Sequence, residues 1–210
     1  SLSVSPLKGK DVLVTGGPTP VLLDNVRRLT NKFTGRLGSE IAMALYAKGV
    51  NAHLIHGESG YAPPSFLPHE VVNDYDSYKE AVSSYLKSHD VSAAIFSAAV
   101  ADYKPVERLP GKVASGKTDW RIELKPTVKV IDEVHESFPN LCMVTFKYQE
   151  NMTHDALMTI AKERLSRGYP MVVMNRGEDK SESGEQVAYL VTADGEERLE
   201  GKSSIAKGIV

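Results

Sequence analysis

The feature that most constrains the fold is an alternation of short apolar runs with segments of helical periodicity. Residues 91–96 and 171–174 are apolar runs of strand length, and residues 37–48 and 153–167 repeat apolar side chains at helical spacing. Strands that read as continuous apolar runs are typical of parallel sheets covered on both faces. We therefore predict a Rossmann-like three-layer α/β fold with a mostly parallel sheet.

Other stretches in the first half of the chain extend this pattern. Tyr75, Tyr78 and Leu86 share one face of a predicted helix, for which Asp74 or Asp76 is available as the cap. That aromatic face is interpreted as core or as a subunit contact. Further apolar runs predict strands at residues 11–15, 51–56, 71–72 and 142–146.

The second half of the chain is less regular. Residues 120–124 alternate like a strand with one exposed face and lead into a helix predicted over residues 127–138. Residues 186–191 and 197–199 flank a turn and predict a C-terminal β-hairpin, which a last helix follows. We see no linker or internal repeat, so residues 1–210 are interpreted as a single domain.

Composition excludes several classes of function. The chain has 41% hydrophobic and 25% charged residues, which is ordinary for a soluble globular protein. A net charge of −2 argues against binding to nucleic acid or to anionic membranes. No apolar stretch reaches the roughly 18 residues of a membrane span. The first residues lack the basic start and apolar core of a signal peptide, so we expect a cytoplasmic protein.

Cysteine and histidine usage argues against a metal site built from these residues. The single cysteine, Cys142, excludes an internal disulfide and a cysteine-based zinc site. Cys142 lies in an apolar run and is expected to be a small buried residue. The six histidines share no metal-binding spacing and are interpreted as structural or surface residues.

The connection after the first predicted strand has the character of a phosphate site. In residues 24–38, Gly35 and Gly38 let backbone N–H groups approach an anion at a helix start, where the helix dipole favours negative charge. Four cations surround this point: Arg27, Arg28, Lys32 and Arg36. The alternative is a tight turn with solvated cations. The preceding Gly-Gly-Pro-Thr-Pro string is not the Gly-x-Gly-x-x-Gly fingerprint, which argues against an ordinary NAD-dependent dehydrogenase.

The order of short motifs resembles that of phosphopantothenate–cysteine ligases, also called phosphopantothenoylcysteine synthetases. Gly-Gly-x-Thr begins at Gly16, Asp-x-Val-Arg ends at Arg27, and Asn-x-x-x-Gly-x-x-Gly begins at Asn31. Ala-Ala-Val-Ala-Asp-Tyr follows at residues 98–103. The resemblance implies a ligase that joins 4′-phosphopantothenate to cysteine through an acyl-nucleotide, with release of pyrophosphate, in coenzyme A biosynthesis.

The resemblance also implies catalytic residues. Asn31 matches the asparagine that holds the substrate carboxylate and the acyl intermediate, and Arg27 matches an arginine that binds substrate, across a dimer interface. Lys112 matches a mobile lysine that neutralises charge growing on the nucleotide. The alternatives are a turn-capping asparagine, a surface arginine and a solvated loop lysine. A homodimer is expected.

Substrate and nucleotide sites are implied in the same way. Gly35 would cradle the phosphate of phosphopantothenate, with Thr34, Arg36 and Ala99 beside it. Asp102 would hold Mg²⁺ together with the phosphates of CTP or ATP, although a turn or helix cap is its alternative role. The nucleotide set comprises Gly16, Gly17, Ala98, Ala101, Asp102, Phe146, Lys147 and Asn175.

Departures from the family pattern leave some points open. Phe33-Thr34 replaces a small polar pair, and Lys112-Val-Ala-Ser replaces a Lys-x-Lys-Lys string, so the choice between CTP and ATP is open. The chain has no room for the flavin-dependent decarboxylase domain of fused enzymes, and no flavin is expected. The rival interpretations are an NAD(P)- or flavin-dependent oxidoreductase on the same fold, or a relative that only binds its ligands.

Overall fold

A computed structural model describes residues 6–58, 61–116 and 118–210, so the first residues, on which the expectation about a signal peptide rests, lie outside it. Its centre is an eight-stranded sheet with the order β14-β13-β12-β11-β7-β1-β5-β6. The strands are β1 (Asp11–Gly16), β5 (Asn51–Gly57), β6 (His69–Val72), β7 (Val91–Phe96), β11 (Cys142–Gln149), β12 (Met171–Arg176), β13 (Val187–Thr192) and β14 (Gly195–Glu200). From β6 to β12 all neighbours are parallel, and β13 and β14 are antiparallel, as predicted.

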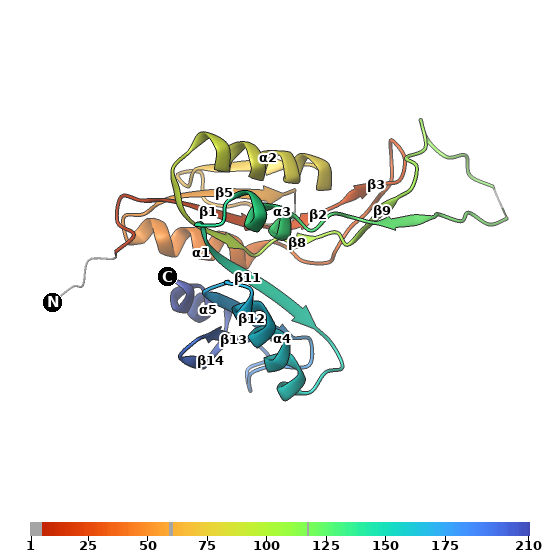
Figure 1. Ribbon diagram of the computed structural model, residues 1–210. Coiled ribbons are helices and arrows are strands. Elements are labelled where there is room, and N and C mark those ends of the chain that lie inside the picture. The colour runs from red at the N-terminus through yellow and green to blue at the C-terminus, as the bar shows by residue number, and fades with distance from the viewer. Residues whose placement is uncertain (1–5, 59–60, 117) are drawn as a thin grey trace.

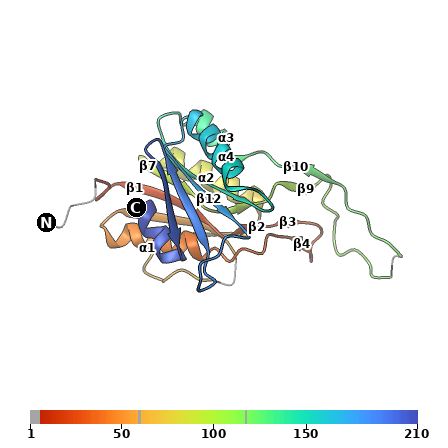
Figure 2. The same ribbon diagram turned by 90° about the horizontal axis from the view of Figure 1, so that it is seen from below.

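Helices cover both faces of this sheet (Figures 1 and 2). The residues of α1 (Arg36–Ala47) and α5 (Lys202–Ile209) share one hydrophobic core, and those of α2 (Tyr75–Ser88), α3 (Val130–Ser137) and α4 (His154–Ser166) share the other. The two cores divide the side chains of each strand by their alternation. Leu13 of β1 therefore enters one core, whereas Val12 and Val14 enter the other. The predicted three-layer α/β fold is confirmed.

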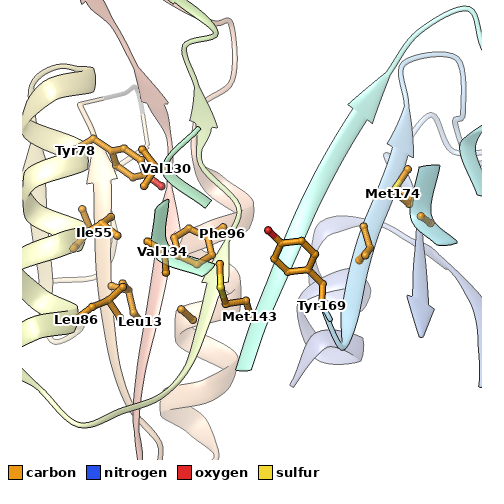
Figure 3. Close-up of a cluster of buried hydrophobic side chains, with 14 of the residues drawn as sticks. Leu13, Ile55, Tyr78, Leu86, Phe96, Val130, Val134, Met143, Tyr169 and Met174 are labelled. Carbon is orange, nitrogen blue, oxygen red and sulfur yellow. The ribbon is translucent and has the colours of Figure 1, made fainter. Parts of the chain in front are cut away.

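The core under α2 follows from the amphipathic pattern of that helix. Figure 3 shows Leu86 of α2 beside Leu13 and Ile55 of the sheet. Asp74 caps the helix by accepting from the Ser77 N–H at 2.8 Å, while the Ser77 hydroxyl lies 3.0 Å from the Asp74 N–H. This capping box satisfies N–H groups that a helix start leaves without intrahelical partners. The predicted helix and its cap are confirmed.

Short strands extend one end of the sheet into a projection. β2 (Pro18–Thr19) pairs with β8 (Ala99–Val100), β3 (Val21–Leu22) with β4 (Arg28–Leu29), and β9 (Tyr103–Pro105) with β10 (Leu124–Pro126). Beyond β3 and β9 the chain reaches away from the body of the molecule (Figures 1 and 2). We call the described residues among 21–29 and 103–126 the arm.

Several local predictions are wrong. Residues 120–123 are not a strand, because they lie in the arm without a paired strand, and pairing starts only at Leu124. The helix predicted from Thr127 begins at Val130, because the Thr127 N–H and hydroxyl bind the main-chain oxygens of Asp102 and Ala101 at 2.9 and 2.6 Å. Cys142 is exposed, because it is the first residue of β11 and precedes the buried part of that strand.

Within the described ranges, none of the helices combines the length and the apolar character needed to cross a bilayer.

Candidate active site

A cleft of about 410 Å³ opens at the carboxyl ends of the central strands. The chain runs from β1 outward to β5 and β6 and then returns to the other side of β1 as β7. Open α/β sheets bind ligands at such a change of direction. The cleft is lined by the loops after β1 and β7, by residues of β11 and β12 and by the start of α3.

Most of the predicted site residues meet in this cleft. The residues predicted for the site that line it are Gly17, Asn31, Thr34, Gly35, Arg36, Ala98, Ala99, Asp102, Phe146, Lys147 and Asn175. They come from segments more than a hundred residues apart in the sequence. Gly16 and Ala101 do not line the cleft but flank residues that do, and the Ala101 N–H donates to the Thr19 hydroxyl at 2.9 Å.

The start of α1 is built from closely packed backbone. Gly35 precedes the helix in the left-handed conformation, with φ of 76°, which glycine adopts without the penalty of other residues. A Cβ atom on Gly38 would lie 2.9 Å from both the Gly16 Cα and the Ser97 Oγ. The first N–H groups of a helix have no partner within the helix, and residues 35–38 line the cleft, so this helix start can offer donors to an anion.

Asn31 joins the two loops that meet over the cleft. Its Nδ2 donates to the main-chain oxygen of Ala99 at 2.9 Å, and the Ala99 N–H donates to the oxygen of Gly17 at 2.9 Å. A side-chain amide has two N–H donors, so one remains for a ligand. The geometry thus fixes the direction of the Asn31 amide beside the start of α1.

A basic cluster also lines the cleft. Lys129 forms an ion pair with Asp102, and Lys147 lies close enough to both for its charge to interact with theirs. Burial, and next the positive charge of Arg164, lower the pKa of Lys147. Arg164 itself donates through Nη1 to the oxygen of Phe146 at 3.1 Å. The cluster therefore has three cations and one carboxylate.

Sequence reasoning missed Arg164, although a signal was present. Leu157 and Ala161 are fully buried on α4, and Arg164 lies seven and three residues after them on the same face. A cation on the apolar face of a helix is unusual unless it has a specific partner. The position of Arg164 on the apolar face of α4 was therefore the sequence signal that could have identified it.

Arg27 and Lys112 do not reach the cleft of their own chain. Both belong to the arm, where Arg27 bonds Asp24 at 3.0 Å and the oxygen of Val113 at 3.2 Å. Its guanidinium lies 4.9 Å from the centroid of the Trp120 ring. Lys112 is exposed. The structure thus separates these two residues from Asn31, with which the resemblance groups them.

Asp24 anchors the arm. Its carboxylate is buried and accepts from the N–H groups of Val26, Arg27 and Val113 at 2.8, 2.7 and 3.1 Å. Burial alone would raise its pKa, but these N–H donors and the Arg27 charge outweigh that effect and hold the pKa of Asp24 below its ordinary value.

A magnesium ion fits this cleft only as a partner of phosphates. Among the described residues, no three histidine, cysteine, aspartate or glutamate side chains are grouped closely enough to hold a metal. Asp102 offers one carboxylate at the cleft wall. One carboxylate plus phosphate oxygens is an ordinary environment for Mg²⁺, so the residues present fit a metal that arrives with a nucleotide.

Comparison with known proteins gives the family. The family described as "DNA/pantothenate metabolism flavoprotein C-terminal domain" matches residues 7–210. The coenzyme A biosynthesis bifunctional protein CoaBC of Thermococcus kodakarensis is 33% identical over 171 residues, which are 80% of this chain and 42% of that protein. CoaBC of Bacillus subtilis is 32% identical over 163 residues, or 77% and 40% of the two chains. The chain thus spans less than half the length of these relatives.

Solved structures agree with this result. The DNA/pantothenate metabolism flavoprotein of Streptococcus pneumoniae has the same fold, with a TM-score of 0.84 over 96% of both chains at 24% identity. A structure of the C-terminal domain of CoaBC gives a TM-score of 0.75 at 27% identity, over 97% of this chain and 93% of that one. The chain therefore belongs to the family of DNA/pantothenate metabolism flavoprotein C-terminal domains.

Proposed function

We propose that this protein is a ligase that forms the amide between 4′-phosphopantothenate and cysteine through an acyl-nucleotide. The observation that carries this proposal is the meeting, in one cleft, of the Asn31 amide, the start of α1 at Gly35 and the basic cluster around Lys147. This combination suits a reaction between two phosphorylated substrates. Relatives named for coenzyme A biosynthesis support the same assignment.

The reaction needs charge stabilisation and positioning rather than a protein nucleophile. The substrate carboxylate attacks the α-phosphorus of the nucleotide, a new P–O bond forms, and the bond to the departing pyrophosphate breaks. The cysteine amine then attacks the acyl carbon, loses a proton, and the nucleoside monophosphate leaves. Asn31 would donate to the acyl oxygen, and the start of α1 at Gly35 would hold the phosphate of phosphopantothenate. Lys129 and Lys147, which line the same cleft, would offset the charge of the nucleotide.

The co-substrate would be CTP or ATP. Asp102 would hold Mg²⁺ against the phosphates of that nucleotide, as a single carboxylate commonly does. When bound, the metal supplies positive charge that polarises the phosphoryl oxygens. Asn175, buried near the end of β12, and Phe146, within β11, would border the nucleoside.

We further propose that two copies of the chain assemble through the arm. Val26 and Tyr103 of the arm are 64% and 54% exposed, so this projecting segment offers apolar side chains to a second copy. Packing against a second copy would bury them. Arg27 does not reach the cleft of its own chain. We therefore propose that the same contact brings Arg27 of one copy towards Asn31 of the other.

The ligase is tested by pyrophosphate release with phosphopantothenate, cysteine and Mg²⁺, when CTP and ATP are supplied separately. We expect release that depends on phosphopantothenate, with a clear preference for one nucleotide. Folded protein that releases no pyrophosphate with either nucleotide would overturn the assignment.

The shared site is tested by mixing two inactive variants. In the proposed dimer each site takes Arg27 from one subunit and Asn31 from the other. A mixed dimer of Arg27→Ala and Asn31→Ala subunits therefore has one intact site, and random exchange of subunits makes half of the dimers mixed. We expect recovery of about a quarter of the wild-type activity, since half of the pairs are mixed and each has one intact site of two. A mixture that stays inactive, or a monomer in light scattering, would contradict the proposal.

A further inference from the structure

Two histidines lie side by side at the β6 edge of the sheet. His56 belongs to the end of β5, and His69 is the first residue of the edge strand β6. The two strands are parallel, with His69 opposite Leu54. Side chains alternate along a strand, so His56, two residues after Leu54, lies on the same face as His69. The centroids of the two imidazole rings are 5.5 Å apart.

Main-chain oxygens determine which nitrogen of each ring carries the proton. Nδ1 of His56 lies 3.1 Å from the oxygen of Gly57, and Nδ1 of His69 lies 2.8 Å from the oxygen of Leu67. A carbonyl oxygen can only accept, so in the neutral rings each Nδ1 is the donor and each Nε2 keeps its lone pair. Histidines that bind a metal through Nε2 are commonly oriented by such a bond from Nδ1 to a main-chain oxygen.

The Nε2 atom of His56 is buried without a partner. His56 is 7% exposed, and its Nε2 has no hydrogen bond to any residue that the structure describes. A buried polar atom without a partner costs stability unless a ligand or an ion satisfies it. Nε2 of His53 is also buried without a partner, but the His53 ring lies on the other face of β5 and stacks on Tyr85, with centroids 4.5 Å apart.

We propose that His56 and His69 bind a zinc ion through their Nε2 atoms. Neutral imidazole is a preferred ligand of zinc. Two imidazoles that share a tetrahedral zinc, at about 2.0–2.1 Å from each nitrogen, have ring centroids roughly 5 Å apart, which is close to the separation found here. Among the described residues no third histidine, cysteine, aspartate or glutamate is grouped with this pair, so water would complete the coordination. His69 is exposed, which leaves this side open to water.

The ion would tie the edge strand β6 to the inside of the sheet. Gly57, whose oxygen orients His56, also lies against Gly17, because a Cβ on Gly17 would be 2.9 Å from that oxygen. The zinc site therefore adjoins the packed backbone that supports the cleft. An ion that binds only the folded chain raises its stability by mass action. Mg²⁺ prefers oxygen ligands, so it should not replace zinc here.

The test compares two exposed histidines in the full chain, freed of metal with a chelator. Titration calorimetry with ZnCl₂ should show one ion bound per wild-type chain. We expect His69→Gln to weaken zinc binding about tenfold or more, while His89→Gln, on α2 and outside the pair, stays within about twofold of wild type. His56→Gln should weaken binding as His69→Gln does, with circular dichroism as the check of folding.

Thermal unfolding gives a second measurement, which does not depend on any enzymatic activity. ZnCl₂ should raise the Tm of the wild type and of His89→Gln, but not that of His69→Gln, and MgCl₂ should raise none of them. Absence of zinc binding by the wild type would overturn the site. Equal zinc affinities of the wild type and His69→Gln, or equal losses in His69→Gln and His89→Gln, would do the same. A protein that binds zinc in this way but releases no pyrophosphate would refute the ligase assignment alone.

Discussion

Gly35 and Gly17 are so close that a side chain on Gly35 has no space: its Cβ would lie 2.7 Å from the Cα of Gly17. The stack continues to the next strand, since a Cβ on Gly17 would lie 2.9 Å from the oxygen of Gly57. Glycine at these places lets three chain segments touch through their backbones. The turn that faces the cleft is therefore supported by main chain.

Gly35→Ala should be strongly destabilising. The substitution combines a positive φ with a steric clash, and we expect a loss of about 3 kcal/mol or more in the free energy of unfolding. Gly111→Ala is the matched control, because Gly111 has φ of 72° but nothing within 4 Å of a Cβ. About 1 kcal/mol is expected there. Urea denaturation measures both, and equal losses would refute the role of the close packing.

Asn31→Ala should remove activity while the fold is kept. Asn31 is exposed, so the free energy of unfolding should change by no more than about 0.5 kcal/mol. Loss of a donor to a developing charge typically lowers kcat by about 10²- to 10³-fold. Asn51→Ala removes a similar surface amide at the start of β5, whereas the cleft lies at the carboxyl ends of the strands, so this variant should leave kcat unchanged. Pyrophosphate release by Asn31→Ala at the wild-type rate would contradict the assigned role.

Asp24→Asn should change how stability depends on pH. The pKa of Asp24 is lowered in the folded state from an ordinary value of 3.8, so its contribution is present above about pH 3.8 and is lost as the pH falls through the folded pKa. We expect the variant to be less stable than wild type near pH 7 and the difference to shrink below about pH 3.8. A difference that is constant from pH 7 to pH 3 would show that the ionised form gains nothing. Thermal unfolding at several pH values decides this.

Tyr78→Phe should modestly lower the free energy of unfolding. The Tyr78 ring is fully buried, and its hydroxyl is hydrogen-bonded to Thr15, whose hydroxyl also accepts from the Ala98 N–H at 3.4 Å. Burial raises the pKa of Tyr78, so the phenol stays neutral at any assay pH. We expect a loss of about 1 kcal/mol in the free energy of unfolding. Tyr46→Phe, at a site 47% exposed, should show no comparable loss.

Local patterns predicted the parts of the fold that depend on local physics. The strand before Gly16, the helix capped by Asp74 and the hairpin at the C-terminus each have a period or a capping residue that the sequence displays. Where long-range bonds decide, prediction failed. Thr127 is held out of α3 by bonds to residues 25 and 26 positions away, and no local pattern reports such bonds.

The site was predictable to the extent that its residues lie in motifs. Asn31, Gly35 and Asp102 were predicted for the site because their neighbours form recognisable strings, and the structure brings them to one cleft. Arg164 belongs to no string, and its role depends on a bond to Phe146 from another element. The distance of Arg27 from the cleft could not be predicted either, because it follows from the direction of the arm.

The outer strand β14 has a consequence for how copies of this protein meet. Its exposed side chains include Glu196, Glu197, Arg198 and Glu200, and charged side chains along an edge strand disfavour pairing with the edge of another sheet. Sheet-to-sheet extension is therefore disfavoured on this flank. If copies pair through the arm, the contact does not use the β14 edge, and the charges along that edge oppose growth of the pair into a fibre.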